Sequence, residues 1–153
     1  MHGLTVGGFI LTCLVAGVLG AAAMVATMAL ISRFGWARGS MIVALGGLVT
    51  KERFGAARVG AVVHTISALV FSAIYVGLML RVGASGLVAT LMLGIGIGFL
   101  HGMVVSLLLV WIIAEHHPLA EFQDADLAIG LSHLAGHVAF GAMVGIVAGL
   151  ALP

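Results

Sequence analysis

Four long apolar segments make up most of this chain and restrict the folds that it can adopt. They cover residues 6–31, 56–80, 86–114 and 127–152, and Arg58 is the only charged residue within them. Charged residues make up 7% of the chain, whereas soluble domains carry about 25%. A membrane-spanning helix needs about 20 apolar residues. The sequence therefore predicts an all-α integral membrane protein, a four-helix bundle that forms a single domain over residues 1–153.

The connections between these segments hold almost all of the charge. Residues 32–55 are basic and surround a short apolar patch, residues 41–49, which is too short to span a membrane and contains Gly46 and Gly47. We expect this patch to be an interfacial or partly re-entrant segment. The connection over residues 115–126 (EHHPLAEFQDAD) is mainly acidic and is interrupted by Pro118.

The distribution of basic residues predicts an orientation. Lysine and arginine near membrane ends are retained on the cytoplasmic side. Five of the six basic residues lie at or beside the first connection: Arg33, Arg38, Lys51, Arg53 and Arg58. We therefore expect the first and third connections to be cytoplasmic and the N and C termini to lie outside. The net charge of +1 and the absence of basic runs exclude nucleic acid as a partner.

Small residues recur at every fourth position in two of the segments. Gly94, Gly98 and Gly102 form one such series, and Gly141, Gly145 and Gly149 form another. Because lipid gives helices little hydrophobic reason to associate, close backbone approach at such GxxxG faces provides the packing energy. We expect these faces to point inward, or to pack against another copy or a partner in a membrane complex.

The histidines are the most informative polar residues. Four of the seven lie inside predicted spans: His64, His101, His133 and His137. With a rise of about 1.5 Å per residue, their depths from the cytoplasmic end are about 9 to 18 Å, so all four fall in one layer. Ionisable groups inside a membrane are costly and usually mark a functional interior.

A transition-metal site is the leading interpretation of this layer. His133 and His137 have the i, i+4 spacing that allows two imidazoles to bind one ion, and His64 and His101 would complete the site. The additional candidates are two methionines in the same layer and four residues near the membrane edge: Met24, Met28, Glu115, His116, Asp124 and Asp126. Methionine favours copper, whereas carboxylates favour zinc or iron. Such a protein would be redox-active or a subunit of an oxidoreductase.

Other interpretations remain open. His64 and His137 are candidate axial ligands of a b-type haem, with Gly60 and Gly141 leaving room for the macrocycle. The histidines also suit a proton path. A purely structural role is the third alternative, in which they bond across helices to backbone carbonyls or to the hydroxyl groups of Thr65, Ser67, Ser106 or Ser132. The chain would equally suit a structural accessory subunit of a membrane complex or a small transporter. No catalytic residue is assigned, because the sequence has neither a Gly-x-Ser-x-Gly nor a phosphate-binding loop motif.

A family resemblance rests on short motifs spread over most of the chain. They are the glycine-, alanine- and methionine-rich first segment, His64 with Phe71 and Tyr75, His101-Gly102, His117-Pro118, and His137 with its following glycines. In these the chain resembles the small four-span bacterial inner-membrane proteins of unknown function, in outline the YagU-like group. The resemblance implies a four-helix fold and a multi-pass location in the bacterial inner (cytoplasmic) membrane. It implies no activity.

Overall fold

The computed structural model of the protein describes residues 4–37 and 40–152, and this part of the chain is helical with no strand. Arg38, one of the basic residues used to predict the orientation, lies outside the described residues. The five α-helices are α1 (Val6–Arg33), α2 (Met41–Thr50), α3 (Ala56–Arg81), α4 (Leu87–Leu108) and α5 (Leu127–Ala151). A π-helical turn, Leu109–Ile113, continues α4, and a 3₁₀ turn covers Ala120–Phe122.

The four spans are confirmed close to their predicted boundaries. α1, α3, α5 and α4 with its π-helical turn are each long and apolar enough to cross a membrane. Local capping fixes where two of them begin: Thr5 Oγ1 accepts a hydrogen bond from the Gly8 amide at 3.1 Å, and Asp126 Oδ1 accepts one from the Ile129 amide at 2.9 Å. These bonds satisfy amide groups that the first turn of a helix leaves without a partner.

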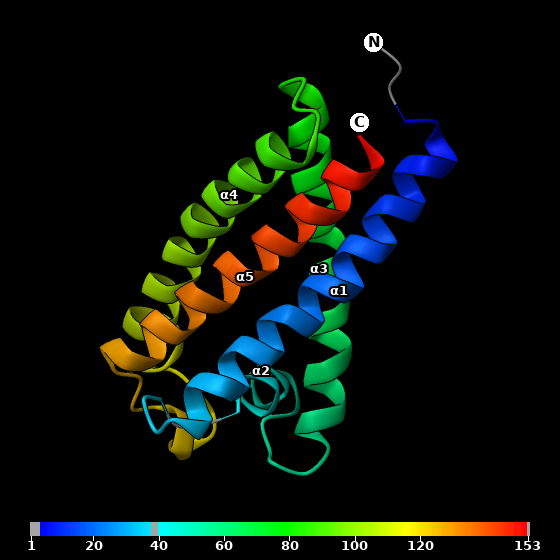
Figure 1. Ribbon diagram of the computed structural model, residues 1–153. Helices are drawn as coiled ribbons and strands as arrows, with labels where there is room; N and C mark the ends of the chain where they lie inside the picture. Colours follow the sequence, from blue (N-terminus) through cyan, green and yellow to red (C-terminus); the bar gives the residue numbers. More distant parts are fainter. Residues whose placement is uncertain (1–3, 38–39, 153) are drawn as a thin grey trace.

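α5 lies in the middle of the bundle, with α4 along one side and α1 along the other (Figure 1). α3 packs against α1 and α2 and makes little contact with α4. The turn between α3 and α4 lies at the same end of the bundle as the start of α1 and the end of α5. There the amide of Gly86, which has a φ of +76°, donates a 2.7 Å hydrogen bond to the Leu152 carbonyl and joins the start of α4 to the end of α5.

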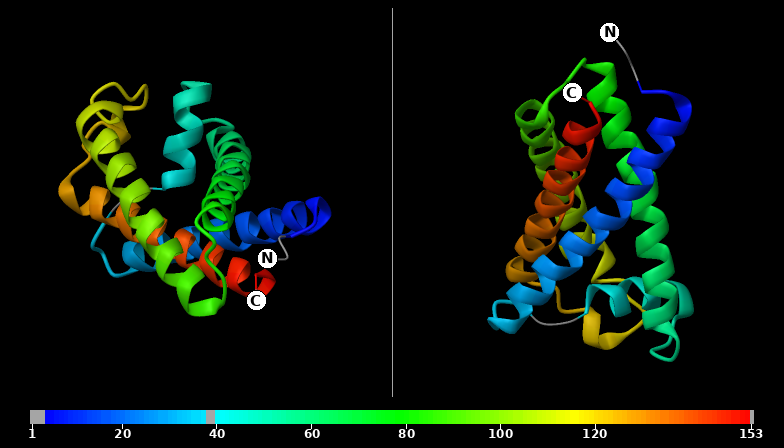
Figure 2. Two further views of the ribbon diagram at one scale, coloured as in Figure 1. Left: turned by 90° about the horizontal axis from the view of Figure 1, so that it is seen from above. Right: turned by 45° about the vertical axis from the view of Figure 1, so that its right-hand side comes forward.

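The two charged connections meet at the opposite end, which we call the α2 end (Figure 1). α2 is too short to span a membrane and lies across this end of the bundle, as Figure 2 shows. The prediction of a short, non-spanning segment between the first two spans is therefore confirmed. Arg53 forms an ion pair with Glu121, which links the first connection to the third.

The glycine series hold α4 and α5 together. A Cβ atom added at Gly98 would lie 2.5 Å from the His137 carbonyl oxygen, and one added at Gly145 would lie 2.5 Å from the Thr90 carbonyl oxygen. Contacts this close require the absence of a side chain. The prediction that these faces point inward is confirmed, and the same contacts leave these glycines no surface for a partner protein.

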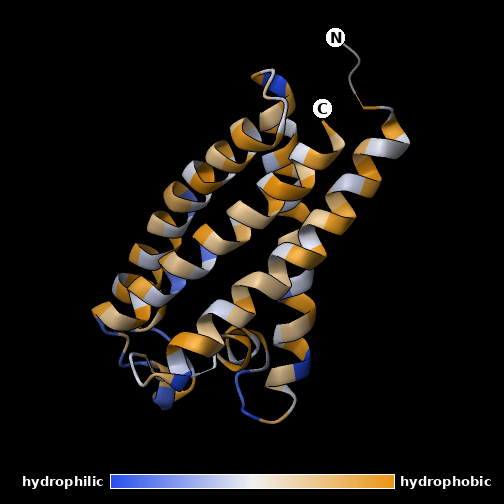
Figure 3. Cartoon of the chain, viewed as in Figure 1, coloured by the Kyte–Doolittle hydropathy of each residue, from blue (hydrophilic) through white to orange (hydrophobic). Residues whose placement is uncertain are grey.

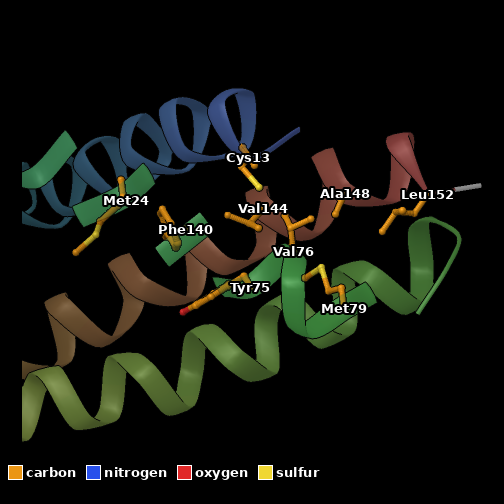
Figure 4. Packing of buried hydrophobic residues seen from close by; sticks show 11 residues of the cluster. Cys13, Met24, Tyr75, Val76, Met79, Phe140, Val144, Ala148 and Leu152 are labelled. Atoms are coloured by element: carbon orange, nitrogen blue, oxygen red, sulfur yellow. The ribbon is translucent and has the colours of Figure 1, made fainter. Parts of the chain in front are cut away.

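The core and the outer surface are both apolar. Tyr75, Val76, Met79 and Val144 are at most 1% exposed and form the core with residues of α1 and α5 (Figure 4). Large apolar side chains also cover the outside, where Leu11, Val62, Val88 and Leu150 are between 58% and 76% exposed. Polar residues gather at the ends of the bundle (Figure 3). An apolar exterior of this extent fits a lipid bilayer and not water.

We predict that Gly98→Ala lowers the free energy of unfolding by about 1–3 kcal/mol, because the new methyl group would force α4 away from α5. Denaturant titration of the detergent-solubilised protein, followed by circular dichroism, measures this change. Gly96→Ala is the matched control, since a Cβ atom at Gly96 would have nothing within 4 Å. An equal loss of stability in the two variants would contradict the packing role of Gly98.

Candidate metal site

A cavity lies at the α2 end. At this end α3 and α4 have diverged from the turn that joins them (Figures 1 and 2). Its volume is about 540 Å³, and all five α-helices contribute to its lining. Most of the lining is apolar. The four intramembrane histidines, His64, His101, His133 and His137, all line this one cavity.

His133 and His137 lie one turn apart on α5 and are both less than 10% exposed. The Nδ1–H of His133 donates to the Ile129 carbonyl at 2.9 Å, and that of His137 donates to the His133 carbonyl at 2.8 Å. A carbonyl oxygen can only accept, so Nδ1 carries the proton of each neutral ring. The Nε2 atom of each ring is therefore left with a free lone pair.

His101 belongs to an aromatic group in the centre of the bundle. Its Nδ1 atom lies 3.0 Å from the Tyr75 hydroxyl oxygen, within hydrogen-bonding distance. The ring centroid of His101 is 4.7 Å from that of His137, edge to face, and 4.1 Å from that of Phe71. α3, α4 and α5 thus meet at the inner end of the cavity through these rings.

Tyr75 lies in the core and not at the surface of the bundle. The side chain is 1% exposed, and it packs edge to face on Phe140 at 5.5 Å. A tyrosine is often interfacial because its hydroxyl group needs water, but here the hydroxyl group has His101 as a partner. No pattern in the sequence indicates this pairing across 26 residues.

His64 contributes from α3. Its Nε2 atom is buried and has no hydrogen-bond partner among the described residues. Three hydroxyl groups considered as structural partners do not bond to a histidine: Thr65 and Ser132 bond to carbonyl groups of their own helices, and Ser106 Oγ is buried without a partner in the described part of the chain. The other three intramembrane histidines bond instead to the Tyr75 hydroxyl group and to carbonyl groups of α5.

The two methionine candidates also line the cavity, from α1. Met24 is 5% exposed, and Met28 lies one turn farther along the same face. The predicted layer thus includes residues from each of the four spans. Among residues 4–37 and 40–152, however, no three histidine, cysteine, aspartate or glutamate side chains converge closely enough to hold a metal ion.

The four candidates near the membrane edge are separated from one another. Asp124 lines the cavity, whereas Glu115, His116 and Asp126 do not. The Nδ1–H of His116 donates to the Ile112 carbonyl at 2.9 Å, and Asp126 caps α5. Of these four, only Asp124 is placed to meet an ion on its way to the histidines.

The glycines expected to make room for a haem do not do so. A Cβ atom at Gly60 would collide with the Ile42 carbonyl of α2, and one at Gly141 would collide with the Gly94 carbonyl of α4. Both glycines are therefore used for helix packing. Any space for a macrocycle has to come from the cavity itself.

His117 has a structural role that the sequence did not specify. It is 3% exposed, its Nδ1 accepts a hydrogen bond from the Leu119 amide at 3.0 Å, and its Nε2–H donates to the Ala44 carbonyl of α2 at 3.0 Å. Both ring nitrogens are therefore occupied. The neighbouring Pro118 indicates a break in the helix, but no pattern in the sequence points to the contact with Ala44.

Comparison of the chain with known protein families, with curated proteins and with solved structures gave no match. The resemblance to the YagU-like group stays a prediction.

We predict that His117→Ala lowers the free energy of unfolding by about 1–3 kcal/mol, because it leaves half-buried backbone groups on two segments without their hydrogen bonds. The change is measured by the same denaturant titration. His116→Ala is the control, since His116 is exposed and bonds only within its own turn, and we expect a change below about 0.5 kcal/mol. Equal effects of the two substitutions would argue against the link to α2.

Proposed function

We propose that this multi-pass membrane protein binds a transition-metal ion in its cavity, with His133 and His137 as the first two ligands. The observation that carries the proposal is the pair of Nε2 lone pairs, each left free by an Nδ1–H bond to a carbonyl oxygen. Metal-bound histidines usually donate their second ring N–H to a carbonyl or carboxylate group in this way, which fixes the tautomer and the ring.

His101 and His64 are the further imidazole candidates. His101 is in ring contact with His137, and His64 Nε2 is buried without a partner in the described residues. An unpartnered buried polar atom is costly, and an ion would remove that cost. Completing the coordination sphere requires rotation of one of these rings, since three of them do not yet converge. A metal ion held in this way supplies Lewis-acid or redox chemistry.

The charge of the cavity lining supports a cation as its occupant. Glu121 and Asp124 are the only charged side chains among the described lining residues, and both lie in the connection at the α2 end. Glu121 is paired with Arg53, whereas Asp124 has no ion-pair partner among the described residues. Asp124 therefore places negative charge at one end of a passage that leads to the imidazoles, an arrangement that attracts cations.

A b-type haem is the second candidate, and the size of the cavity favours it. About 540 Å³ is the size of a typical small-molecule pocket and far exceeds the need of a single ion. His64 and His137 would be the axial ligands, as the sequence suggested. Because Gly60 and Gly141 are occupied by packing contacts, the macrocycle would have to lie wholly within the cavity.

We further propose that the α2 end is cytoplasmic and that the protein resides in the bacterial inner membrane. The proposal rests on the basic residues at this end, which include Arg33 and Lys51. The ends of the chain and Arg81 would then lie on the outer side.

We predict about one metal ion per chain in protein purified in detergent, as measured by elemental analysis after incubation with copper or zinc and removal of excess ion. The double variant His133→Ala, His137→Ala should contain metal only at background level, because both fixed Nε2 ligands are gone. His116→Ala should retain the ion, since its ring lies outside the cavity. Metal-free wild-type protein, or an unchanged metal content in the double variant, would disprove the proposal.

An optical spectrum of the same sample separates the two candidates. A bound haem gives an intense Soret band, which His64→Ala and His137→Ala should each abolish. A featureless spectrum from protein purified from haem-replete cells excludes the haem and leaves the metal-ion proposal standing.

The orientation can be tested with single cysteines, because Cys13→Ser leaves the chain without a thiol. In that background we expect a membrane-impermeant maleimide to label Val82→Cys in intact spheroplasts, and Glu52→Cys only after the membrane is permeabilised. Both positions are exposed, at opposite ends of the bundle. The reverse pattern would show that the α2 end faces outward.

A further inference from the structure

Two methionines lie against the turn of α5 that carries the two fixed histidines. A Cβ atom added at Gly136 would lie 3.1 Å from Met24 Cγ, 3.2 Å from Met28 Cγ and 3.4 Å from Met28 Sδ. Gly136 is on the same helical turn as His133 and His137. Because Gly136 has no side chain, the methionines of α1 can approach this turn closely.

From these contacts we propose that the cavity holds copper(I), bound by Nε2 of His133 and His137 together with the thioether sulfurs of Met24 and Met28. The inference rests on the proposed function, since it requires that the two imidazoles bind a metal. Each pair of ligands is spaced i, i+4, so the four side chains come from adjacent turns of two packed helices. All four also line the same cavity.

The ligand chemistry selects copper(I) over zinc or iron. Thioether sulfur is a soft ligand that binds copper(I) well, whereas zinc and iron(II) prefer thiolate, imidazole or carboxylate. The thiol of Cys13 does not lie at this site, because it is about three turns before Met24 on α1 and packs in the core near Val144 (Figure 4). Met24 is directed from α1 toward α5 in the same view.

Burial of charge points to the same ion. Two imidazoles and two thioethers are neutral, so the bound ion keeps its full charge inside the membrane. The cost of transferring an ion into a low-dielectric medium rises with the square of its charge, so a divalent ion costs four times as much as copper(I). None of α1, α3, α4 and α5 contains an aspartate or glutamate that could offset a second charge.

The packing around Phe140 indicates the side from which an ion can reach the site. Phe140 lies one turn beyond His137 and packs closely on α1, with a Cβ atom at Gly20 placed only 2.7 Å from its ring. This contact closes the cavity toward the core. An ion reaching the four ligands would therefore come from the α2 end, past Asp124.

The test is an anaerobic titration of the purified full-length protein with copper(I) against a chromogenic copper(I) chelator, with a parallel zinc(II) titration. We expect one copper(I) per chain, and at least a tenfold loss of copper(I) affinity in the double variant Met24→Leu, Met28→Leu. Leucine nearly conserves the volume of methionine, so the packing on Gly136 is kept. X-ray absorption should show copper–sulfur scattering in the wild type and none in this variant.

The matched control is Met92→Leu, Met103→Leu, which changes two methionines on the exposed side of α4 and should leave copper(I) affinity unchanged. The thioether inference would be overturned if Met24→Leu, Met28→Leu kept the copper(I) affinity of the wild type and the wild type showed no copper–sulfur scattering. Copper or zinc bound through His133 and His137 would still support the proposed function. Binding of neither ion would overturn both.

Discussion

The close contact between the glycine faces of α4 and α5 is the interaction on which the rest of the structure depends. Lipid offers helices little hydrophobic reason to associate, so attraction has to come from backbones that approach closely. At Gly94, Gly98, Gly141 and Gly145 this approach leaves no space even for a methyl group. α5 is thereby fixed to α4, and the histidines that it carries are fixed with it.

The cavity lies where close backbone contacts between helices are missing. α3 is held to α1, where the Ser72 hydroxyl donates to the Cys13 carbonyl at 2.8 Å and Gly17 lies against Leu69. No close backbone packing of this kind joins α3 to α4 among the described residues. The two helices diverge from their common turn. The space between them is bridged at its inner end by the rings of Phe71, Tyr75 and His101. Helix packing thus determines both the position of the site and its depth.

The sequence predicts the spans, the non-spanning segment and the inward glycine faces. It can do so because the length of an apolar segment and the spacing of its glycines are properties of a single helix. The roles of Tyr75, Gly60 and His117 could not be predicted in this way. Each depends on a contact with a residue far away in the chain. Ala44 and His117, for example, are 73 positions apart. The same limit applies to Gly136, whose significance appears only once Met24 and Met28 are seen to pack on it.

The links at the α2 end join segments that look like separate loops in the sequence. His117 is bonded to α2, and Glu121 is paired with Arg53 just beyond it, so the first and third connections are joined across the mouth of the cavity. A motion that widened the mouth would have to move both connections together or break these two links. Among the described residues of the first connection, Gly35 and Gly55 both have a φ of +76°, a backbone conformation that favours glycine. The mouth through which an ion would reach the histidines is thus bounded by two connections that are bonded to each other.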